Sequence, residues 1–276
     1  SSAPSPISAM LSGVLIKAIG MYVIMRLFFN MFEVQYETAY IITSIGALSM
    51  IVGVFLAIGQ WDMKRLLAYH SISQMGYVVL AMGIGMIIIA EDGNKGIAAL
   101  SIAGGLYHLI NHAVFKGLLF LTAGSVEHAT GTRNLQELGG LSDRMPITAY
   151  SSFGASMAIS GIPPFNGFFS KLIIIIAAVK AQFYLLAVFA VVVSIVTLAS
   201  FMKVQRYAFF SVSRDEEKFK KVKEVPFPMA FSMVLLGILC LFLSILIIPG
   251  IREEILMPSV NILMNGGDYA LHALGK

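Results

Sequence analysis

Charged residues are scarce in this sequence. Only 12% of its 276 residues are Asp, Glu, Lys or Arg, whereas a soluble globular domain contains roughly 25%. Apolar residues make up 58% of the chain, and the mean hydropathy is +0.84. Because a water-soluble chain of this length needs more polar side chains to cover its surface, the composition excludes a soluble domain and indicates an integral membrane protein.

Cysteine is nearly absent as well. The one cysteine, Cys240, lies inside an apolar run, which excludes a disulfide within the chain and a cysteine-ligated metal site. The first residues, Ser1 to Pro6, lack the basic region that begins a signal peptide. Because the chain starts without Met, in a stretch of Ser and Pro, we expect it to be a piece of a longer protein.

The motifs of common enzymes are also missing. The sequence contains no glycine-rich nucleotide loop, no pairing of a nucleophile with a base, and no set of residues with metal-ligand spacing. We therefore predict no active site of its own, no cofactor, no metal and no nucleic-acid partner.

Long apolar runs fill the rest of the sequence. A helix needs ~20 apolar residues to cross a hydrocarbon core ~30 Å thick, and it satisfies its own backbone hydrogen bonds there. Residues 172–178 and 235–248 are continuous apolar runs, unlike the alternating strands of a β-barrel. We predict an all-α membrane protein of about seven transmembrane helices, with a membrane domain over 1–249 and a tail over 250–276. The predicted spans are 7–29, 39–60, 65–90, 98–126, 146–178, 182–210 and 227–249. Within the tail, 251–264 is either a short interfacial helix or a mobile end.

The fourth and fifth predicted spans are longer than a membrane requires, so they are tilted, broken or extended beyond it. The fifth contains two prolines and two glycines in its middle: Gly161, Pro163, Pro164 and Gly167. Prolines remove backbone donors and glycines add freedom, and helices broken at membrane depth are typical of ion and substrate sites. The fourth has a second weak point at 122–125. A plain proline kink is the alternative.

Basic residues alternate between rich and poor loops. The loops after the second, fourth and sixth spans, counted with the span ends beside them, carry eleven Lys and Arg, and the other loops with the tail carry four. Because cytoplasmic loops are enriched in Lys and Arg, we predict that the chain starts in the cytoplasm and ends outside, in the cell or inner membrane. The basic segment 203–223 is interpreted as a solvated connector, with contact to anionic lipid or a partner subunit as the alternative.

Three lysines lie inside predicted spans and away from the basic loops: Lys17, Lys116 and Lys171. Each costs ~2.5–3.5 kcal/mol at the centre of a membrane helix. Such residues mark hydrated polar paths by default, although a lysine near a helix end can instead extend its amine to the interface.

The fourth span also holds His108 and His112, which with Lys116 are spaced i, i+4 and i+8. This spacing predicts one polar stripe on an otherwise apolar helix. Histidine exchanges protons near neutral pH, so the stripe suits proton transfer. Histidines that bond a neighbouring helix are the alternative. A metal site is disfavoured because the motif is His-Leu-Ile-Asn-His, with no acidic partner nearby.

Polar residues continue into the third span. Asp62 suits the beginning of a helix, and His70, Ser71, Ser73 and Gln74 follow it. These side chains either form an access path for protons or make hydrogen bonds that pack helices together.

Three segments, 62–77, 108–120 and 161–171, resemble the antiporter-like subunits of respiratory complex I. That family also includes the large subunits of Mrp-type Na⁺/H⁺ antiporters and of membrane-bound hydrogenases. The resemblance covers residues 1–249. It implies a fold of about fourteen core helices with two inverted repeats of five, each holding a broken helix. This chain would then supply the eighth to fourteenth helices, its second to sixth spans would form the second repeat, and its fourth and fifth spans would be broken.

The resemblance also implies roles for individual residues. The lysine at Lys17 would link the two half-channels. His108, His112 and Lys116 would continue a central polar axis, and Lys171, where some members carry glutamate, would gate exchange with the outer side. The glutamate–lysine pair of the family's first half is absent here, so that half is expected on the same polypeptide or on a separate subunit.

Together these observations predict ion translocation, with the proton favoured, by the antiporter-like subunit of a redox-driven complex of hydrogenase or complex I type. Whether the chain counts as part of an enzyme stays open, because it carries no redox site. The alternatives are a subunit of a stand-alone Mrp-type Na⁺/H⁺ antiporter and a scaffold that does not pump. Expected partners are other membrane subunits, including the first half of the fold, and the lipid bilayer.

Overall fold

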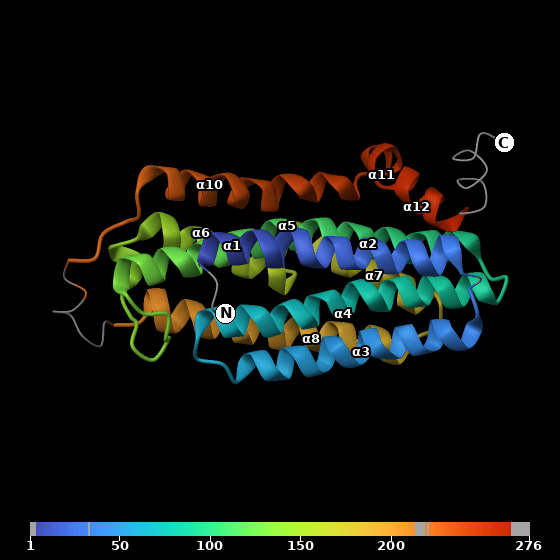
Figure 1. Ribbon diagram of the computed structural model, residues 1–276, viewed down its shortest axis with the longest axis horizontal. Helices are drawn as coiled ribbons and strands as arrows, with labels where there is room; N and C mark the ends of the chain where they lie inside the picture. Colours follow the sequence, from blue (N-terminus) through green and yellow to red (C-terminus); the bar gives the residue numbers. More distant parts are fainter. Residues whose placement is uncertain (1–3, 33, 213–218, 220, 266–276) are drawn as a thin grey trace.

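Long helices lie side by side along one axis of the molecule (Figure 1). The computed structural model describes residues 4–32, 34–212, 219 and 221–265. Within these residues there is no β-strand, only an isolated bridge between Asp62 and Asn134. The prediction of an all-α protein is therefore confirmed.

Six helical segments of the described chain are long and apolar enough to cross a membrane. Their bounds agree with six of the predicted spans to within a few residues. They are Ser5–Met31, Tyr36–Ile58 (α3), Met63–Ala90 (α4), Lys95–Thr130 (α5), Tyr184–Phe210 and Phe227–Ile247.

The remaining predicted span, 146–178, is two helices in the structure. α6 covers Pro146–Ser160 and α7 covers Asn166–Lys180, each 15 residues long. A helix of that length extends about 22 Å, which is less than the hydrocarbon thickness of ~30 Å. The two together make the crossing that the sequence predicted as one helix, and the predicted break is confirmed.

The break has a local cause in the sequence. Gly161 ends α6 with a φ of +78°, a left-handed conformation that glycine adopts without strain. Pro163 and Pro164 follow and cannot donate backbone hydrogen bonds. At the start of α7, a Cβ atom on Gly167 would clash with the carbonyl oxygen of Ala158. The two half-helices therefore meet closely only because residue 167 has no side chain.

The predicted break in the fourth span is wrong, because α5 is one continuous helix of 36 residues. At the predicted weak point, Thr122 donates its hydroxyl to the carbonyl of Leu119 at 3.0 Å. Gly124 packs directly against Ser5. Small residues here permit a close helix contact, and one interior glycine costs a helix only about 1 kcal/mol.

Side-chain caps and a glycine define the ends of the two central helices. Asp62 precedes α4 and accepts a hydrogen bond from the backbone N–H of Arg65 at 2.9 Å. Asn94 caps α5 in the same way. Gly131 ends α5 with a φ of +73°. These residue types satisfy the free backbone groups at helix ends, which is why the turns lie there.

The first crossing is irregular. Its α-helical parts, α1 (Ser5–Ala9) and α2 (Ile16–Arg26), alternate with the π-helical segments η1 (Met10–Leu15) and η2 (Leu27–Met31). Its outward face exposes large apolar side chains, namely Ile16, Ile19, Tyr22 and Val23.

The last elements are α8 (Tyr184–Val204) with the π-helical η4 (Gln205–Phe210), α10 (Phe227–Phe242) with η5 (Leu243–Ile247), α11 (Pro249–Ile255) and α12 (Met257–Met264). In Figure 1, α10 and α3 lie on opposite sides of the bundle.

The predicted tail is helical over most of its described part. α12 packs on the first crossing, where the Asn30 amide donates to the carbonyls of Ile262 and Leu263 at 3.0 and 3.2 Å. The rest of the tail, 266–276, lies outside the described residues, as do Arg214, Lys218 and Lys220 of the predicted basic segment.

Glycines allow α3 and α4 to pack backbone against backbone. A Cβ atom on Gly53 of α3 would lie 2.6 Å from the backbone nitrogen of Ser73, and one on Gly76 of α4 would collide with the backbone of Met50. Contacts of this kind drive helix association in membranes, where the hydrophobic effect between helices is absent.

We predict that Gly76→Ala destabilises the protein by about 1–3 kcal/mol, because the new methyl group forces the two backbones apart. Thermal unfolding in detergent measures the change. Gly20→Ala is the matched control, since nothing lies within 4 Å of a Cβ atom there. Equal unfolding temperatures for Gly76→Ala and the parent would contradict the close packing of α3 on α4.

Candidate functional site

Polar side chains that are fully enclosed are concentrated on three neighbouring helices, α4, α5 and α7. None of them is more than 3% exposed. They are His70, Ser71 and Gln74 of α4, His108, Asn111, His112 and Lys116 of α5, and Asn166, Ser170 and Lys171 of α7. Buried polar and charged groups are costly in a membrane protein, so their concentration on three neighbouring helices defines the candidate site.

Lys116 is completely buried, and its amine donates to the backbone carbonyl of Leu67 on α4. The amine also lies 5.6 Å from the centre of the Phe120 ring. The same Leu67 carbonyl accepts a hydrogen bond from the hydroxyl of Ser71 at 3.1 Å. The lysine of the predicted stripe therefore contacts α4 and not the lipid.

Lys17 lies on the first crossing, in α2, and is partly buried. Its amine donates to the hydroxyl of Ser12 at 2.6 Å. Ser12 faces α4, where its oxygen is 3.4 Å from the Ser71 oxygen. The structure thus brings Lys17 and Lys116 to the same part of α4.

His108 bonds across to α7, its Nδ1 atom lying 2.9 Å from the hydroxyl oxygen of Ser170. Its ring centre is also 5.5 Å from that of Tyr77. Among the described residues, neither ring nitrogen of His112 has a hydrogen-bond partner, and the same holds for Nε2 of His108 and the side-chain amide of Gln74. Because buried polar atoms are normally satisfied by protein or ordered water, this cluster is a suitable place for internal water.

Lys171 occupies the helix break. Its amine donates to the carbonyl of Ile159 at 2.8 Å and lies 4.7 Å from the centre of the Tyr77 ring. In an unbroken helix, that carbonyl would accept from the residue four positions on, which here is Pro163 and has no N–H. Because α6 ends at Ser160, the Ile159 carbonyl has no partner within its helix, and Lys171 uses it as an acceptor.

A cavity of about 240 Å³ lies between α7 and α8, next to the helix break. Lys171, Ser160 and Ser194 contribute polar atoms to its otherwise apolar lining. The Ser194 hydroxyl is 2.9 Å from the hydroxyl of Tyr77, and Ser160 has no hydrogen-bond partner within the described chain.

Two asparagines fasten α5 to the beginning of α7. The Asn111 amide donates to the Asn166 carbonyl at 3.0 Å, and the Asn166 amide donates to the Asn111 side-chain oxygen at 2.9 Å. The sequence alone did not assign a role to this pair. Asn111, three positions after His108, was nevertheless a sign that the polar stripe contains more than three residues.

His70 points away from the stripe, toward α8. Its Nε2 atom lies 2.8 Å from the Ser200 hydroxyl, and its ring centre is 4.7 Å from that of Phe201. This geometry is a hydrogen bond between packed helices, one of the two roles that the sequence left open. A role in proton access stays a prediction.

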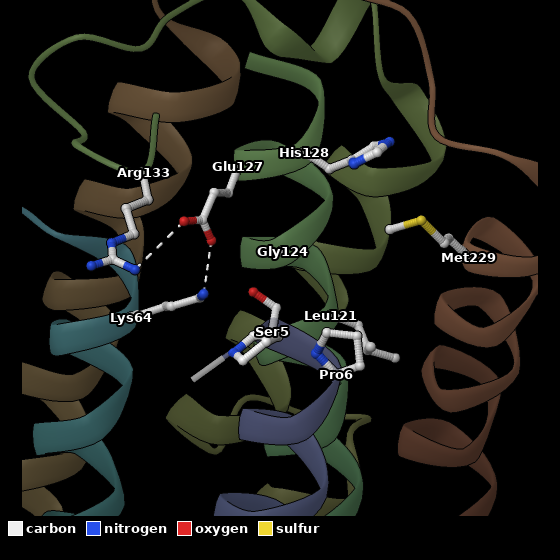
Figure 2. A pocket seen from close by; sticks show the side chains of 10 residues that line it. Ser5, Pro6, Lys64, Leu121, Gly124, Glu127, His128, Arg133 and Met229 are labelled. Atoms are coloured by element: carbon white, nitrogen blue, oxygen red, sulfur yellow. Dashed lines mark ion pairs between the residues drawn. The ribbon is translucent and has the colours of Figure 1, made fainter. Parts of the chain in front are cut away.

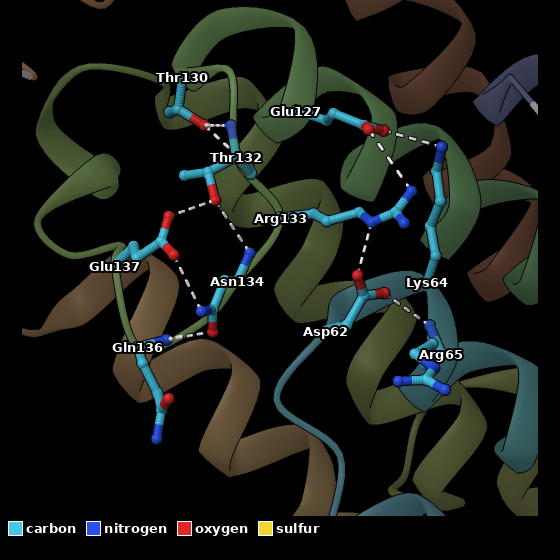
Figure 3. Close-up of polar contacts among 10 residues, drawn as sticks. All are labelled: Asp62, Lys64, Arg65, Glu127, Thr130, Thr132, Arg133, Asn134, Gln136 and Glu137. Carbon is cyan, nitrogen blue, oxygen red and sulfur yellow. Dashed lines mark hydrogen bonds and ion pairs between the residues drawn. The ribbon is translucent and has the colours of Figure 1, made fainter. Parts of the chain in front are cut away.

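A network of ion pairs connects the beginning of α4 with the last turn of α5 (Figure 3). Glu127 of α5 accepts from Lys64 at 2.8 Å and from Arg133 at 3.5 Å, and Arg133 also pairs with Asp62 at 2.5 Å. The Lys64 side chain is only 4% exposed, although the sequence assigns it to the link between the second and third predicted spans. The network ties α4 to α5 and to the loop that follows α5.

A second cavity, of about 520 Å³, adjoins this network (Figure 2). It lies between the start of the chain at Ser5 and Pro6, the pair of Lys64 and Glu127, and Met229 of α10. The described residues contain no group of three His, Cys, Asp or Glu side chains that could hold a metal ion.

The arrangement of apolar crossings, a broken helix and enclosed lysines defines a multi-pass membrane protein of the antiporter-like kind. Residues 1–197 match the family described as NADH:quinone oxidoreductase/Mrp antiporter, TM. The chain belongs to this family.

Curated relatives agree with this assignment. The chain is 38% identical over 216 residues to a Na⁺/H⁺ antiporter subunit of Alkalihalophilus pseudofirmus, a match that covers 78% of this chain and 41% of the relative. It is 33% identical over 272 residues to a Na⁺/H⁺ antiporter subunit of Staphylococcus aureus, covering 94% of this chain and 34% of the relative. The chain therefore spans less than half the length of these relatives.

Solved structures share the fold. A chain of the Mrp complex from Dietzia sp. matches with a TM-score of 0.82 and 26% identity, over 96% of this chain and 55% of that one. A chain of the archaeal membrane-bound sulfane sulfur reductase matches with a TM-score of 0.75 and 31% identity, over 89% and 40%. A chain of Thermus thermophilus complex I, at 24% identity and a TM-score of 0.77 over 95% and 52%, has the same fold.

We predict that Glu127→Gln destabilises the protein by about 1.5–3 kcal/mol, because it removes the carboxylate that accepts from the buried Lys64. Thermal unfolding in detergent measures the loss. Glu254→Gln is the control, since that carboxylate is exposed on α11 and its removal should change stability by less than about 0.5 kcal/mol. An unchanged unfolding temperature for Glu127→Gln would show that the network contributes nothing.

Proposed function

We propose that this chain is the translocating half of an antiporter-like subunit and moves protons through the polar interior between α4, α5 and α7. The residues proposed to carry protons are Lys17, His70, His108, His112, Lys116 and Lys171. The helix break is proposed to hold Lys171 in place, and it consists of Gly161, Pro163, Pro164 and Gly167.

One observation carries the proposal. The amines of Lys116 and Lys171 are enclosed, each donates to a backbone carbonyl, and within the described chain no carboxylate lies within 4.0 Å of either. An ammonium without a counter-ion is costly at membrane depth. Its cost falls when it gives up a proton, so a lysine in this environment is suited to exchange protons and poorly suited to a static structural role.

The chemistry of the interior favours the proton over sodium. Sodium prefers oxygen ligands, carboxylates among them, and the three-helix interior offers imidazoles, amines, amides and hydroxyls. Imidazole nitrogens can both donate and accept a proton. His108 and His112 lie between Lys116 and the helix that carries Lys171, which supports their place on the path.

The chain is proposed to work inside a larger membrane assembly. The exposed apolar face of the first crossing, at Ile16, Ile19 and Tyr22, is a surface that the missing first half of the fold would cover. The membrane domain would comprise 1–249, with 250–276 as a tail on its outer end. By the distribution of Lys and Arg, the end that holds Lys64 and Arg133 would face the cytoplasm.

Two kinds of assembly are candidates, each supported by a different likeness. A redox-driven complex is supported by the 31% identity to a chain of the sulfane sulfur reductase. A stand-alone Na⁺/H⁺ antiporter is supported by the 38% identity to the antiporter subunit of Alkalihalophilus pseudofirmus. Proton movement that requires an electron donor would identify the first, and proton movement driven by a sodium gradient alone would identify the second.

A scaffold that does not pump is the competing function. It would gain nothing from enclosing Lys116 and Lys171, each of which costs ~2.5–3.5 kcal/mol at a helix centre.

We predict that Lys116→Ala and Lys171→Ala each lower proton translocation at least tenfold in proteoliposomes of the assembled complex, because each removes an exchangeable proton from the path. A pH-sensitive dye measures translocation, and size-exclusion chromatography checks assembly. Lys95→Ala is the control, since Lys95 is exposed at the first residue of α5. Unchanged translocation in both interior variants would make these lysines structural and favour the scaffold.

A further inference from the structure

A chain of hydrogen-bonding groups connects Lys17 with Lys116. The Lys17 amine donates to Ser12 at 2.6 Å, and the oxygens of Ser12 and Ser71 are 3.4 Å apart. The Ser71 hydroxyl and the Lys116 amine both donate to the carbonyl of Leu67. Two hydroxyl groups therefore lie between the two lysines, and the Ser71 hydroxyl and the Lys116 amine meet at the Leu67 carbonyl.

The backbone of the first crossing makes this alignment possible. Residues five apart in an α-helix are separated by about 140° around the axis, so Ser12 and Lys17 would face different directions. η1 is π-helical, and its backbone N–H at Ile16 donates to Leu11, five residues back. Hydrogen bonds of this spacing widen the turn, so residues five apart come nearer to one face than they do in an α-helix, and this helps Lys17 to reach Ser12.

The position of the first crossing is fixed by a glycine. A Cβ atom on Gly13 would lie 3.2 Å from the carbonyl oxygen of Ala113 and 3.4 Å from the backbone nitrogen of Gly117. The residue after Ser12 therefore touches the backbone of α5 on either side of Lys116. This contact holds Ser12 beside α4 and α5 at the depth of that lysine.

We propose that the hydroxyls of Ser12 and Ser71 are the proton relay between Lys17 and Lys116. This inference rests on the proposed function and adds residues to it. In one transfer, the Lys17 ammonium gives a proton to the Ser12 oxygen as the Ser12 proton passes to the Ser71 oxygen. The Ser71 proton passes in turn to the neutral Lys116 amine. One N–H bond is lost at Lys17 and one is gained at Lys116, and both serines stay neutral hydroxyls.

The Ser71 hydroxyl can take two orientations in the relay, toward the Leu67 carbonyl or toward the Lys116 amine. A protonated Lys116 has no lone pair and can only donate, so it cannot take a proton from Ser71, and the Ser71 hydroxyl stays on the carbonyl that it contacts in the structure. A neutral Lys116 has a lone pair, and the Ser71 hydroxyl can rotate from the carbonyl to the amine. The relay is therefore ready to deliver a proton only when Lys116 has lost its own.

The distance between the two serine hydroxyls is the step of the relay that helix movement can change. The 3.4 Å separation exceeds the ~2.7–2.8 Å typical of hydroxyl pairs, whereas the 2.6 Å bond from Lys17 to Ser12 is closed. A small movement of the first crossing toward α4 would bring the two hydroxyls to normal hydrogen-bond distance. Movement of that helix, whose outer face is exposed in this chain, would control whether protons pass.

The test uses the assembled complex in proteoliposomes, with an imposed pH gradient and a pH-sensitive dye. We expect Ser12→Ala and Ser71→Ala each to lower proton flux at least tenfold, and Ser12→Thr to restore it to within about twofold of the parent, because threonine keeps the hydroxyl. Ser73→Ala is the matched control on α4: it is equally buried, but its hydroxyl donates to the carbonyl of Met50, off the line. Its flux should equal that of the parent.

The outcomes separate this inference from the proposed function. If Lys116→Ala abolishes flux while Ser12→Ala and Ser71→Ala do not, the relay is refuted and the translocation path stands. If Ser12→Thr is as impaired as Ser12→Ala, the residue acts through packing and the relay is likewise refuted. If Lys116→Ala also leaves flux unchanged, the proposed function fails with it.

Discussion

The structure depends on the placement of the Lys116 and Lys171 amines inside a bundle of apolar helices, where no carboxylate of the described residues lies within 4.0 Å of either. Backbone carbonyls and aromatic rings take the place of counter-ions: Leu67 and Phe120 for Lys116, and Ile159 and Tyr77 for Lys171. Neutral acceptors stabilise an ammonium less than a carboxylate does. The amines are therefore held in position, but their charge is not locked. This combination is the physical basis for the proton path proposed above.

Each acceptor is available because of a local feature of the sequence. The end of α6 at Gly161 leaves the carbonyl of Ile159 without a helical partner, so it can accept from Lys171. Gly167 allows the two half-helices to meet, so that the lysine reaches back across the break. In the first crossing, the π-helical turn helps to bring Ser12 within hydrogen-bond distance of Lys17. Departures from regular α-helix thus occur where a polar side chain needs a partner, and this is how helices tolerate polar groups at membrane depth.

Much of the fold was predictable because apolar runs, prolines and glycines act locally. The helix bounds and the break at Gly161 follow from such signals. The burial of Lys64 was not predictable, because it depends on Glu127, which lies far along the chain and is brought near only by packing. The continuous α5 was also missed, since small residues at 122–125 indicate either a break or a close contact, and only the partner helix decides between them. Ser12 was not identified, because its place beside Ser71 depends on how the first crossing packs on α4. The roles of the site residues remain predictions.

The most direct test of the account is a structure of the assembled complex at a resolution that shows ordered water. We expect water to bond both ring nitrogens of His112 and the amide of Gln74, forming a continuous hydrogen-bonded line from Lys116 past His108 to Lys171. These atoms are enclosed and have no other partner within the described chain. A dry interior, in which these nitrogens bond directly to protein groups and no line connects the lysines, would contradict the account.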